Sequence, residues 1–305
     1  MELSGLHHVT MITADARGTV DFAARVLGLR FVKKTVNFDQ PDAYHLYFGD
    51  ERGAAGSILT WFEFPQAAPG RAGAGTIHTI ELSVGSAAAV GFWEARLAGA
   101  GIAAERDGDA LRFADRDGLR FAIAPAEFGD PPLRAAHPEI APEHAIIGIE
   151  GARAHAAPGG GDALLRETLG FTSLGGGGYR LAGELRSFRW AYDPAPPAPA
   201  RLGAGSVHHI AWASRDDEHA GWQRTVAQAG AAVTDVRDRD YFRSIYFREP
   251  HGVLFEIATL GPGFAVDEDP EHLGEELRVP AMHAHLRERL ERTLAPLENP
   301  RALGR

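Results

Sequence analysis

One carboxylate, Glu256, stands in the middle of a segment whose other residues predict a buried β-strand. Residues 248–256 read Arg-Glu-Pro-His-Gly-Val-Leu-Phe-Glu, and the Pro-His-Gly sequence predicts a tight turn before the strand. Side chains alternate along a strand, so Glu256 is expected on the same face as Leu254 and Ala258. A carboxylate buried there needs a partner, which is an arginine, a cluster of hydrogen-bond donors or a metal ion.

Two histidine pairs favour the metal ion. His7-His8 lies near the start of the chain and His208-His209 lies shortly before the turn, and each pair opens an apolar segment that predicts a strand. The sequence holds 14 histidines in 305 residues, and this composition gives about 0.6 adjacent pairs by chance. The pairs alone therefore prove little, and it is their repeated context that indicates a shared function.

The chain repeats one order of elements four times. In each copy a strand precedes a helix, and the helix ends at a glycine before further short strands. In the four copies the helix is expected over Thr19–Leu27, Ala87–Leu97, Asp162–Leu169 and Asp217–Ala229. The copies span residues 5–64, 76–125, 144–193 and 207–260, a repeat of roughly 50 residues. The sequence therefore predicts an α+β fold of four βαβββ modules that form two curved-sheet, barrel-like domains.

Aligning the four copies tests the histidines as ligands. Two positions can be compared across the four copies. One is the position of the second histidine of a pair in the first strand, and the other is the fourth residue after the glycine of the last turn. Only the first and fourth copies carry ligand chemistry there, as His8 in the first and as His209 with Glu256 in the fourth, while Thr60 leaves the remaining position free. Two histidines and one carboxylate are the set that leaves open positions on non-haem Fe(II). The first and fourth modules must then share one curved sheet, with the second and third as a metal-free partner.

The composition limits the classes of function. The chain has no cysteine, so His, Asp and Glu must hold any metal ion, which suits Fe(II), Mn(II) or Zn(II). Its net charge of −10 argues against a nucleic-acid partner. No basic segment followed by an apolar run opens the chain, and no stretch approaches the roughly 18 apolar residues of a membrane span. We expect a globular, cytoplasmic protein with no membrane partner, and the sequence leaves open whether it forms a homo-oligomer.

Proline-rich segments divide the chain. Residues 125–142 are expected to link an N-terminal half, residues 1–130, to a C-terminal half, residues 143–262, with two modules in each. Residues 263–305 are expected to form an acidic tail with a solvated surface, ending in a helix over residues 282–294. The apolar stripe of that helix, expected to pack on the body, consists of Met282, Leu286, Leu290 and Leu294.

Several segments resemble the vicinal oxygen chelate superfamily, and more closely its ring-cleaving dioxygenases that act on hydroquinones. They are Leu6-His-His-Val-Thr10, residues 27–37, residues 44–50, Val207-His-His-Ile-Ala211 and residues 249–256. The resemblance implies an Fe(II)-dependent, extradiol-type ring-cleaving dioxygenase that opens a small hydroquinone- or catechol-like aromatic with O2. It implies Fe(II), or alternatively Mn(II), bound by His8, His209 and Glu256. The residues that it places around these ligands are His7, Thr10, His208, Arg239 and Tyr246.

Within this assignment, Arg239 is expected to stabilise developing negative charge, and Tyr246 or His208 to move protons. Two other functions stay open. One is a metal-dependent isomerase or lyase of the glyoxalase type, against which Thr60 argues, because a glutamate at that position would complete such a site. The other is a non-catalytic protein of the same fold that binds an aromatic ligand, which would not need the three ligands together.

Overall fold

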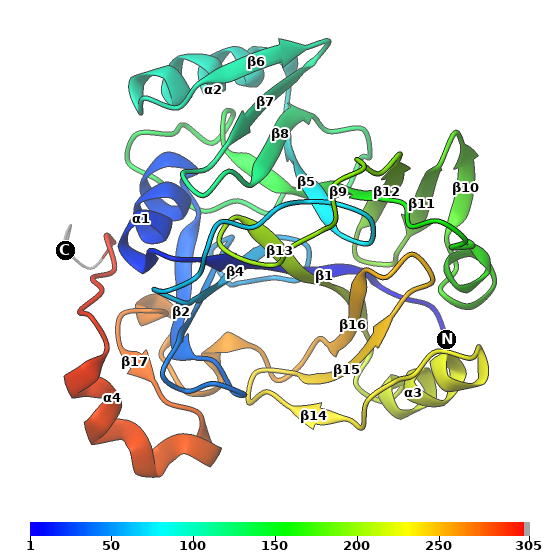
Figure 1. Ribbon diagram of the computed structural model, residues 1–305. Coiled ribbons are helices and arrows are strands. Elements are labelled where there is room, and N and C mark those ends of the chain that lie inside the picture. Colours follow the sequence, from blue (N-terminus) through cyan, green and yellow to red (C-terminus); the bar gives the residue numbers. More distant parts are fainter. Residues whose placement is uncertain (302–305) are drawn as a thin grey trace.

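The computed structural model describes residues 1–301 and contains two curved β-sheets (Figure 1). The nine-stranded sheet has, in spatial order, β14 (Arg237–Asp238), β15 (Arg243–Arg248), β16 (Leu254–Thr259), β13 (Ser206–Ser214), β1 (Gly5–Thr13), β4 (Ile58–Glu63), β3 (Tyr44–Gly49), β2 (Arg30–Val36) and β17 (Leu277–Arg278). The eight-stranded sheet has β10 (Thr172–Gly175), β11 (Gly178–Ala182), β12 (Ser187–Asp193), β9 (Ile146–His155), β5 (Ile77–Val84), β8 (Arg120–Pro125), β7 (Ala110–Ala114) and β6 (Ala104–Asp107). This architecture confirms the predicted α+β fold.

Each sheet joins two modules that are distant in sequence. β1 pairs antiparallel with β13, so the first and fourth modules share the nine-stranded sheet. β5 pairs antiparallel with β9, so the second and third modules share the other. Within a module the first strand lies parallel to the last, as β1 does to β4 and β13 to β16. The expected pairing of modules is confirmed, whereas the division of the chain into two halves stays a prediction.

The helix of the first module begins earlier than predicted. α1 (Ala16–Val20) starts before Thr19 because the side chain of Asp15 accepts a hydrogen bond from the backbone N–H of Gly18. Such a cap satisfies one of the free N–H groups at a helix start. The chain then continues as a π-helical segment, Asp21–Val26.

The helix predicted over Asp162–Leu169 in the third module lies at the expected place but is shorter. Only a π-helical turn, Leu164–Thr168, forms there. Glycines at positions 159–161 precede the turn, and Gly170 follows it with φ at +79°, so the sequence leaves space for little more than one turn. The helices of the second and fourth modules lie where they are expected, as α2 (Ala87–Gly99) and α3 (His219–Gln228).

The end of the chain does not form the single predicted helix. It forms a 3₁₀ segment, Ala281–Leu286, followed by α4 (Arg287–Thr293). Leu290 is fully buried and Leu294 packs against the core, whereas Met282 is 61% exposed. The tighter 3₁₀ pitch moves Met282 off the apolar stripe, so only the second half of the stripe contacts the body. Two further 3₁₀ turns precede this region, Phe264–Val266 and Pro270–His272.

Most acidic residues of the tail are exposed, as predicted, among them Asp267, Asp269, Glu271 and Glu276, but Glu268 is an exception. Glu268 is buried and accepts a hydrogen bond from Nζ of Lys33, which also donates to Asp267 at 2.6 Å. Lys33 itself is fully buried on β2, and an ammonium group in that position needs carboxylate partners. β17 then pairs parallel with β2, so the tail, orange to red in Figure 1, extends the edge of the nine-stranded sheet.

The largest hydrophobic cluster of the described residues draws on both sheets. All five tryptophans of the chain belong to it, and each is at most 2% exposed. This packing fixes the positions of the strands that carry the functional side chains. Within residues 1–301, the structure has no helix that combines the length and the apolar character needed to cross a membrane.

Candidate metal centre

Three potential ligand atoms meet inside the nine-stranded sheet. Nε2 of His8 on β1 lies 3.3 Å from Nε2 of His209 on β13. Oε2 of Glu256 on β16 lies 3.4 Å from the first nitrogen and 2.9 Å from the second. All three side chains are buried, and within residues 1–301 they are the one group of three His, Cys, Asp or Glu side chains placed to hold a metal ion. The structure thus brings together the three predicted ligands.

The strand register explains why these side chains meet. β13 is hydrogen-bonded to β1 on one side and to β16 on the other, so the three strands are neighbours. Thr10 pairs with His209, and Ala211 pairs with Glu256. Because alternate residues of a strand share a face, His209 lies on the same face as Ala211 and Glu256. A shift in the β1–β13 pairing just before His8 accompanies its approach to this face.

Each ligand histidine contacts the histidine that precedes it in sequence. Nδ1 of His8 lies 2.8 Å from Nδ1 of His7, and Nδ1 of His209 lies 2.8 Å from Nδ1 of His208. Burial lowers the pKa of both His7 and His208 to about 3, so these rings are neutral and can accept a hydrogen bond. When Nδ1 of a ligand histidine donates, its Nε2 keeps a free electron pair, which is the form that binds metal ions.

Glu256 completes the set. Its Oε1 accepts a hydrogen bond from the hydroxyl of Ser244. Burial alone raises the pKa of Glu256, but His8 and His209 outweigh burial and hold that pKa well below its ordinary value. Oε2 has no aligned hydrogen-bond partner among the described residues. A carboxylate oxygen and two ring nitrogens therefore converge on a common space rather than on each other, and this donor set fits a divalent cation.

The ligand atoms face a cavity of about 30 Å³, which has room for roughly one or two water molecules. Two of the predicted surrounding residues line it, Arg239 and Tyr246, and Nε of Arg239 donates to the Tyr246 hydroxyl at 3.3 Å. Burial raises the pKa of Tyr246, so its hydroxyl stays protonated. Burial lowers the pKa of Arg239, but Tyr246 and Asp39 outweigh burial and the net shift is upward. The cavity wall therefore offers one charged and one neutral donor.

The other three predicted residues do not line the cavity. His7 and His208 contact the ligand rings from the side away from Glu256 and do not line the cavity. Thr10 is fully buried, and its Oγ1 accepts a hydrogen bond from Thr60 at 3.3 Å. None of the three side chains lines the cavity, and their expected roles stay predictions.

His45 and Tyr47 line the cavity, although the sequence analysis did not single them out. The hydroxyl of Tyr47 lies 2.8 Å from Nδ1 of His45, and Nε2 of His45 lies 2.6 Å from Oγ1 of Thr60. Because Thr60 donates to Thr10, it accepts from His45, and Nδ1 of His45 accepts from Tyr47. His45 and Tyr47 are two residues apart on β3, and this spacing in the sequence already indicated that both side chains lie on one face of the strand. The remaining residues that line the cavity are Asn37, Phe38, Asp39, Phe62 and Phe242.

The eight-stranded sheet has ion pairs on the strands that correspond to β1, β13 and β16. Arg189 on β12 contacts Glu81 on β5 at 3.0 Å, and Arg153 on β9 contacts Asp193 at 2.8 Å. Guanidinium groups therefore neutralise Glu81 and Asp193 in this sheet. Within the described part of the chain, the metal-binding group of three side chains lies in the nine-stranded sheet; the metal-free role of the second and third modules stays a prediction.

Comparisons with known proteins support one family. Residues 5–123 and 143–257 match the model of the "Glyoxalase/Bleomycin resistance protein/Dioxygenase superfamily". The Bacillus subtilis protein named "Putative ring-cleaving dioxygenase MhqO" is 41% identical over 304 residues, covering 96% of each chain. The "Chlorohydroquinone/hydroquinone 1,2-dioxygenase" of Sphingobium indicum is 32% identical over 311 residues, again covering 96% of each chain.

Solved structures agree with this result. The crystal structure of a "putative dioxygenase" from Bacillus subtilis has a TM-score of 0.90 at 39% identity, covering 97% of this chain and 98% of the other. Glyoxalase I from Zea mays has a TM-score of 0.57 at 11% identity, covering 84% and 92%, and shares the fold. The resemblance stated from the sequence is confirmed. The chain belongs to the glyoxalase, bleomycin resistance protein and dioxygenase superfamily.

Proposed function

We propose that the protein is an Fe(II)-dependent ring-cleaving dioxygenase that opens a hydroquinone- or catechol-like aromatic with O2 in an extradiol-type reaction. His8, His209 and Glu256 hold the ion in this proposal, and Mn(II) is the alternative to Fe(II). The chemistry that such an ion supplies when bound is electron transfer between a ring hydroxylate and O2 held side by side. The names of the relatives support the reaction class.

The convergence of three ligand atoms carries the proposal. Oε2 of Glu256 and Nε2 of both histidines lie within 3.4 Å of one another in a fully buried space. A buried carboxylate without a compensating group costs roughly several kcal/mol, so a site built in this way requires a cation. Three protein ligands leave the other coordination positions for substrate and O2.

Arg239 and Tyr246 are placed to orient the substrate. Both line the cavity, and both hold their protons because their pKa values are raised. They can therefore donate hydrogen bonds to an oxygen that becomes negative during the reaction. Tyr246, rather than His208, is our candidate for proton transfer, because His208 does not face the cavity. Phe62 and Phe242 provide apolar walls for an aromatic ring.

The segment between β2 and β3, residues 37–43, must move to admit a substrate. The cavity that it closes holds about 30 Å³, which is too small for an aromatic ring. Asp39 fixes the segment through Arg239, 2.9 Å from its Oδ2, and Arg237, 3.3 Å from its Oδ1. Closure excludes water from the centre. An entering substrate then replaces Asp39 as the partner of the Arg239 guanidinium.

The C-terminal segment holds the outer side of the same loop. Nε2 of His283 lies 2.8 Å from the carbonyl oxygen of Phe38, and Arg289 donates to Asp42 at 2.8 Å. The tail thus contacts the loop that covers the cavity. We infer that it limits how far residues 37–43 open.

Anaerobic metal analysis of the purified protein tests the proposal. Protein made under iron-replete, reducing conditions is expected to hold about one Fe(II) or Mn(II) per chain, as one three-ligand site requires. It is then expected to consume O2 with members of a hydroquinone and catechol panel. Two ions per chain, or O2 uptake that does not depend on the metal, would contradict the assignment.

A further inference from the structure

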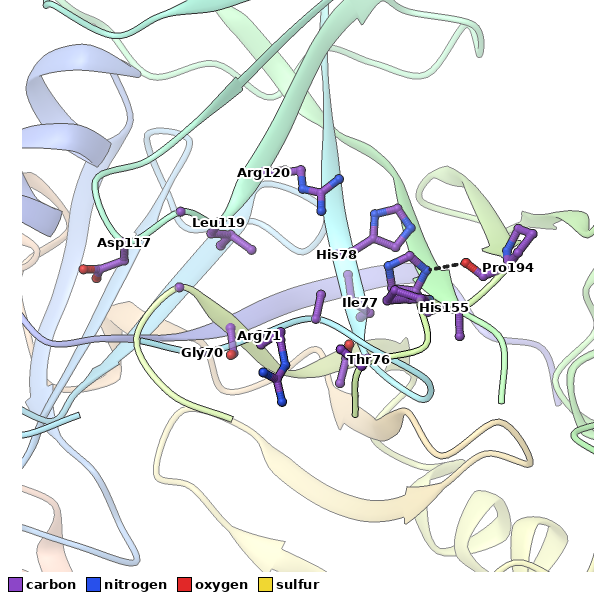
Figure 2. Close-up of a pocket in the computed structure, with 17 residues that line it drawn as sticks. Gly70, Arg71, Thr76, Ile77, His78, Asp117, Leu119, Arg120, His155 and Pro194 are labelled. Atoms are coloured by element: carbon purple, nitrogen blue, oxygen red, sulfur yellow. Dashed lines mark hydrogen bonds between the residues drawn. The ribbon is translucent and has the colours of Figure 1, made fainter. Parts of the chain in front are cut away.

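A second cavity, of about 570 Å³, lies outside the metal centre (Figure 2). Its walls come from the β7–β8 turn, the start of β5, the end of β9 and the connectors that precede β5 and follow β12. None of the residues that line it also lines the metal cavity. Its volume is within the range of small-molecule sites, roughly 300–1,000 Å³.

Two stacked imidazole rings form a flat part of the wall. The centroids of His78 and His155 lie 4.1 Å apart, with 26° between the ring planes. His78 is fixed by contacts with Thr79 at 2.9 Å and Asp193 at 3.0 Å. His155 donates from Nδ1 to the carbonyl oxygen of Pro194 at 3.0 Å, the dashed line in Figure 2. His78 is buried and His155 is half-buried, so the outer face of His155, with His78 stacked behind it, is a preformed planar surface for a ligand.

Arg120 supplies an uncompensated positive charge. Its side chain extends toward the two imidazole rings in Figure 2, and no carboxylate of residues 1–301 forms an ion pair with it. The acids near the cavity have other partners, since Asp193 binds Arg153 at 2.8 Å and Asp117 accepts from Thr13 at 2.7 Å. Asp117 also lies on the side of the cavity away from the histidines (Figure 2). The fork of a guanidinium group fits a carboxylate in bidentate geometry.

We propose that this cavity binds a small planar carboxylate, whose carboxylate group contacts Arg120 and whose flat body lies against the face of His155 that points away from His78. Ile77 and Leu119 add buried apolar surface beside the rings. Two sources share this chemistry: an intact aromatic acid, and an unsaturated open-chain acid of the kind that ring cleavage produces. The site uses none of the metal ligands, so it does not depend on the metal.

Calorimetric titration with benzoate, cis,cis-muconate and acetate tests the proposal. Benzoate represents the aromatic acid, muconate the open-chain acid, and acetate a carboxylate without a planar body. Arg120→Gln is expected to weaken binding of the planar acids at least about tenfold, since a hydrogen-bonded charge is lost, and Arg120→Lys to weaken it less. Arg112→Gln is the matched control, because Arg112 is an exposed arginine of the same sheet that is paired with Asp107. Repeating the titrations in Glu256→Gln excludes carboxylates bound at the metal.

The outcomes separate the sources and test the site. Tighter binding of benzoate identifies an aromatic acid as the ligand class, and tighter binding of muconate identifies the open-chain acid. His155→Ala is expected to weaken binding of either acid by several-fold, because it removes the ring against which the ligand lies. Binding that is unchanged in Arg120→Gln, no binding of either planar acid, or equally tight binding of acetate would each overturn the proposal.

Discussion

Nδ1 of His208 lies 2.8 Å from Nδ1 of His209, and Nε2 of the same His209 ring lies 2.9 Å from the carboxylate of Glu256. His208 therefore selects which nitrogen of its neighbour carries the proton. His7 bears the same relation to His8. The first and fourth modules therefore contain the same contact between a candidate ligand histidine and the histidine that precedes it.

Replacing either supporting histidine should weaken metal binding. His7→Phe and His208→Phe keep the ring and remove the nitrogen that accepts from the ligand, so metal affinity is expected to fall about 10- to 100-fold. Competition with a chelator measures this change. His285→Gln is the control, because His285 is exposed in the C-terminal segment. Equal affinity in all four proteins would show that the nitrogen contacts do not support the ligands.

Glu256→Gln should lose the metal ion while the fold persists. The amide keeps an oxygen for Ser244 but lacks the charge that a divalent ion needs. Glu249→Gln is a matched control, since Glu249 is also buried but its carboxylate accepts from the hydroxyl of Tyr192 and the N–H of Val253. Metal content and circular dichroism are the measurements. Full metal content in Glu256→Gln would show that Glu256 does not bind the metal ion and has a purely structural role.

Asp39→Asn should lower KM with little change in kcat. Asp39 competes with the substrate for Arg239, and Asp39 is mostly exposed while Arg239 is mostly buried. Exposed ion pairs contribute about 0.2–1 kcal/mol, so a decrease in KM of up to about fivefold is expected. Asp42→Asn is the control, because Asp42 lies on the same loop but contacts Arg289. An equal effect of both substitutions would point to general loop mobility instead of competition at Arg239.

Stability should decrease between pH 6.5 and about 4, in part through His219. This side chain is buried, its Nε2 has no partner among the described residues, and burial lowers its pKa to about 4. The folded pKa is below the unfolded value of about 6.5, so the unfolded chain binds more protons in this window and acid favours unfolding. His219→Gln should make the loss of unfolding free energy shallower there, by at most about 1.4 kcal/mol per pH unit. Urea denaturation at pH 7, 5.5 and 4.5 measures it, and an unchanged pH dependence would contradict this role.

The sequence predicted which three side chains meet in the nine-stranded sheet, because the repeat made equivalent positions comparable. His8, His209 and Glu256 each stood out against copies without ligand chemistry, and the pairing of the first and fourth modules followed. The cavity residues on loops were harder to predict from the sequence, because Asp39 and Phe242 have no counterparts in the repeat that mark them as functional. Their positions depend on tertiary contacts, such as those between Asp39 and Arg239.

The tail shows a second limit of the sequence. Lys33 and Glu268 are far apart in the chain, and each alone is typical of an exposed residue. Their burial as a pair depends on how β17 returns to β2. The third-module helix lies where it was predicted, but the glycines on both sides of it shorten the segment.

Oxygen consumption by the metal-loaded enzyme tests the central claim most directly. The account predicts that the protein takes up O2 with a hydroquinone or catechol, and that uptake stops when the iron is oxidised, because ferric iron cannot supply an electron to O2. An assay of a hemithioacetal under argon provides the contrast, since an isomerase of the glyoxalase type needs no O2. Turnover of the hemithioacetal at full rate under argon, with no O2 uptake on any dihydroxylated ring, would contradict the assignment.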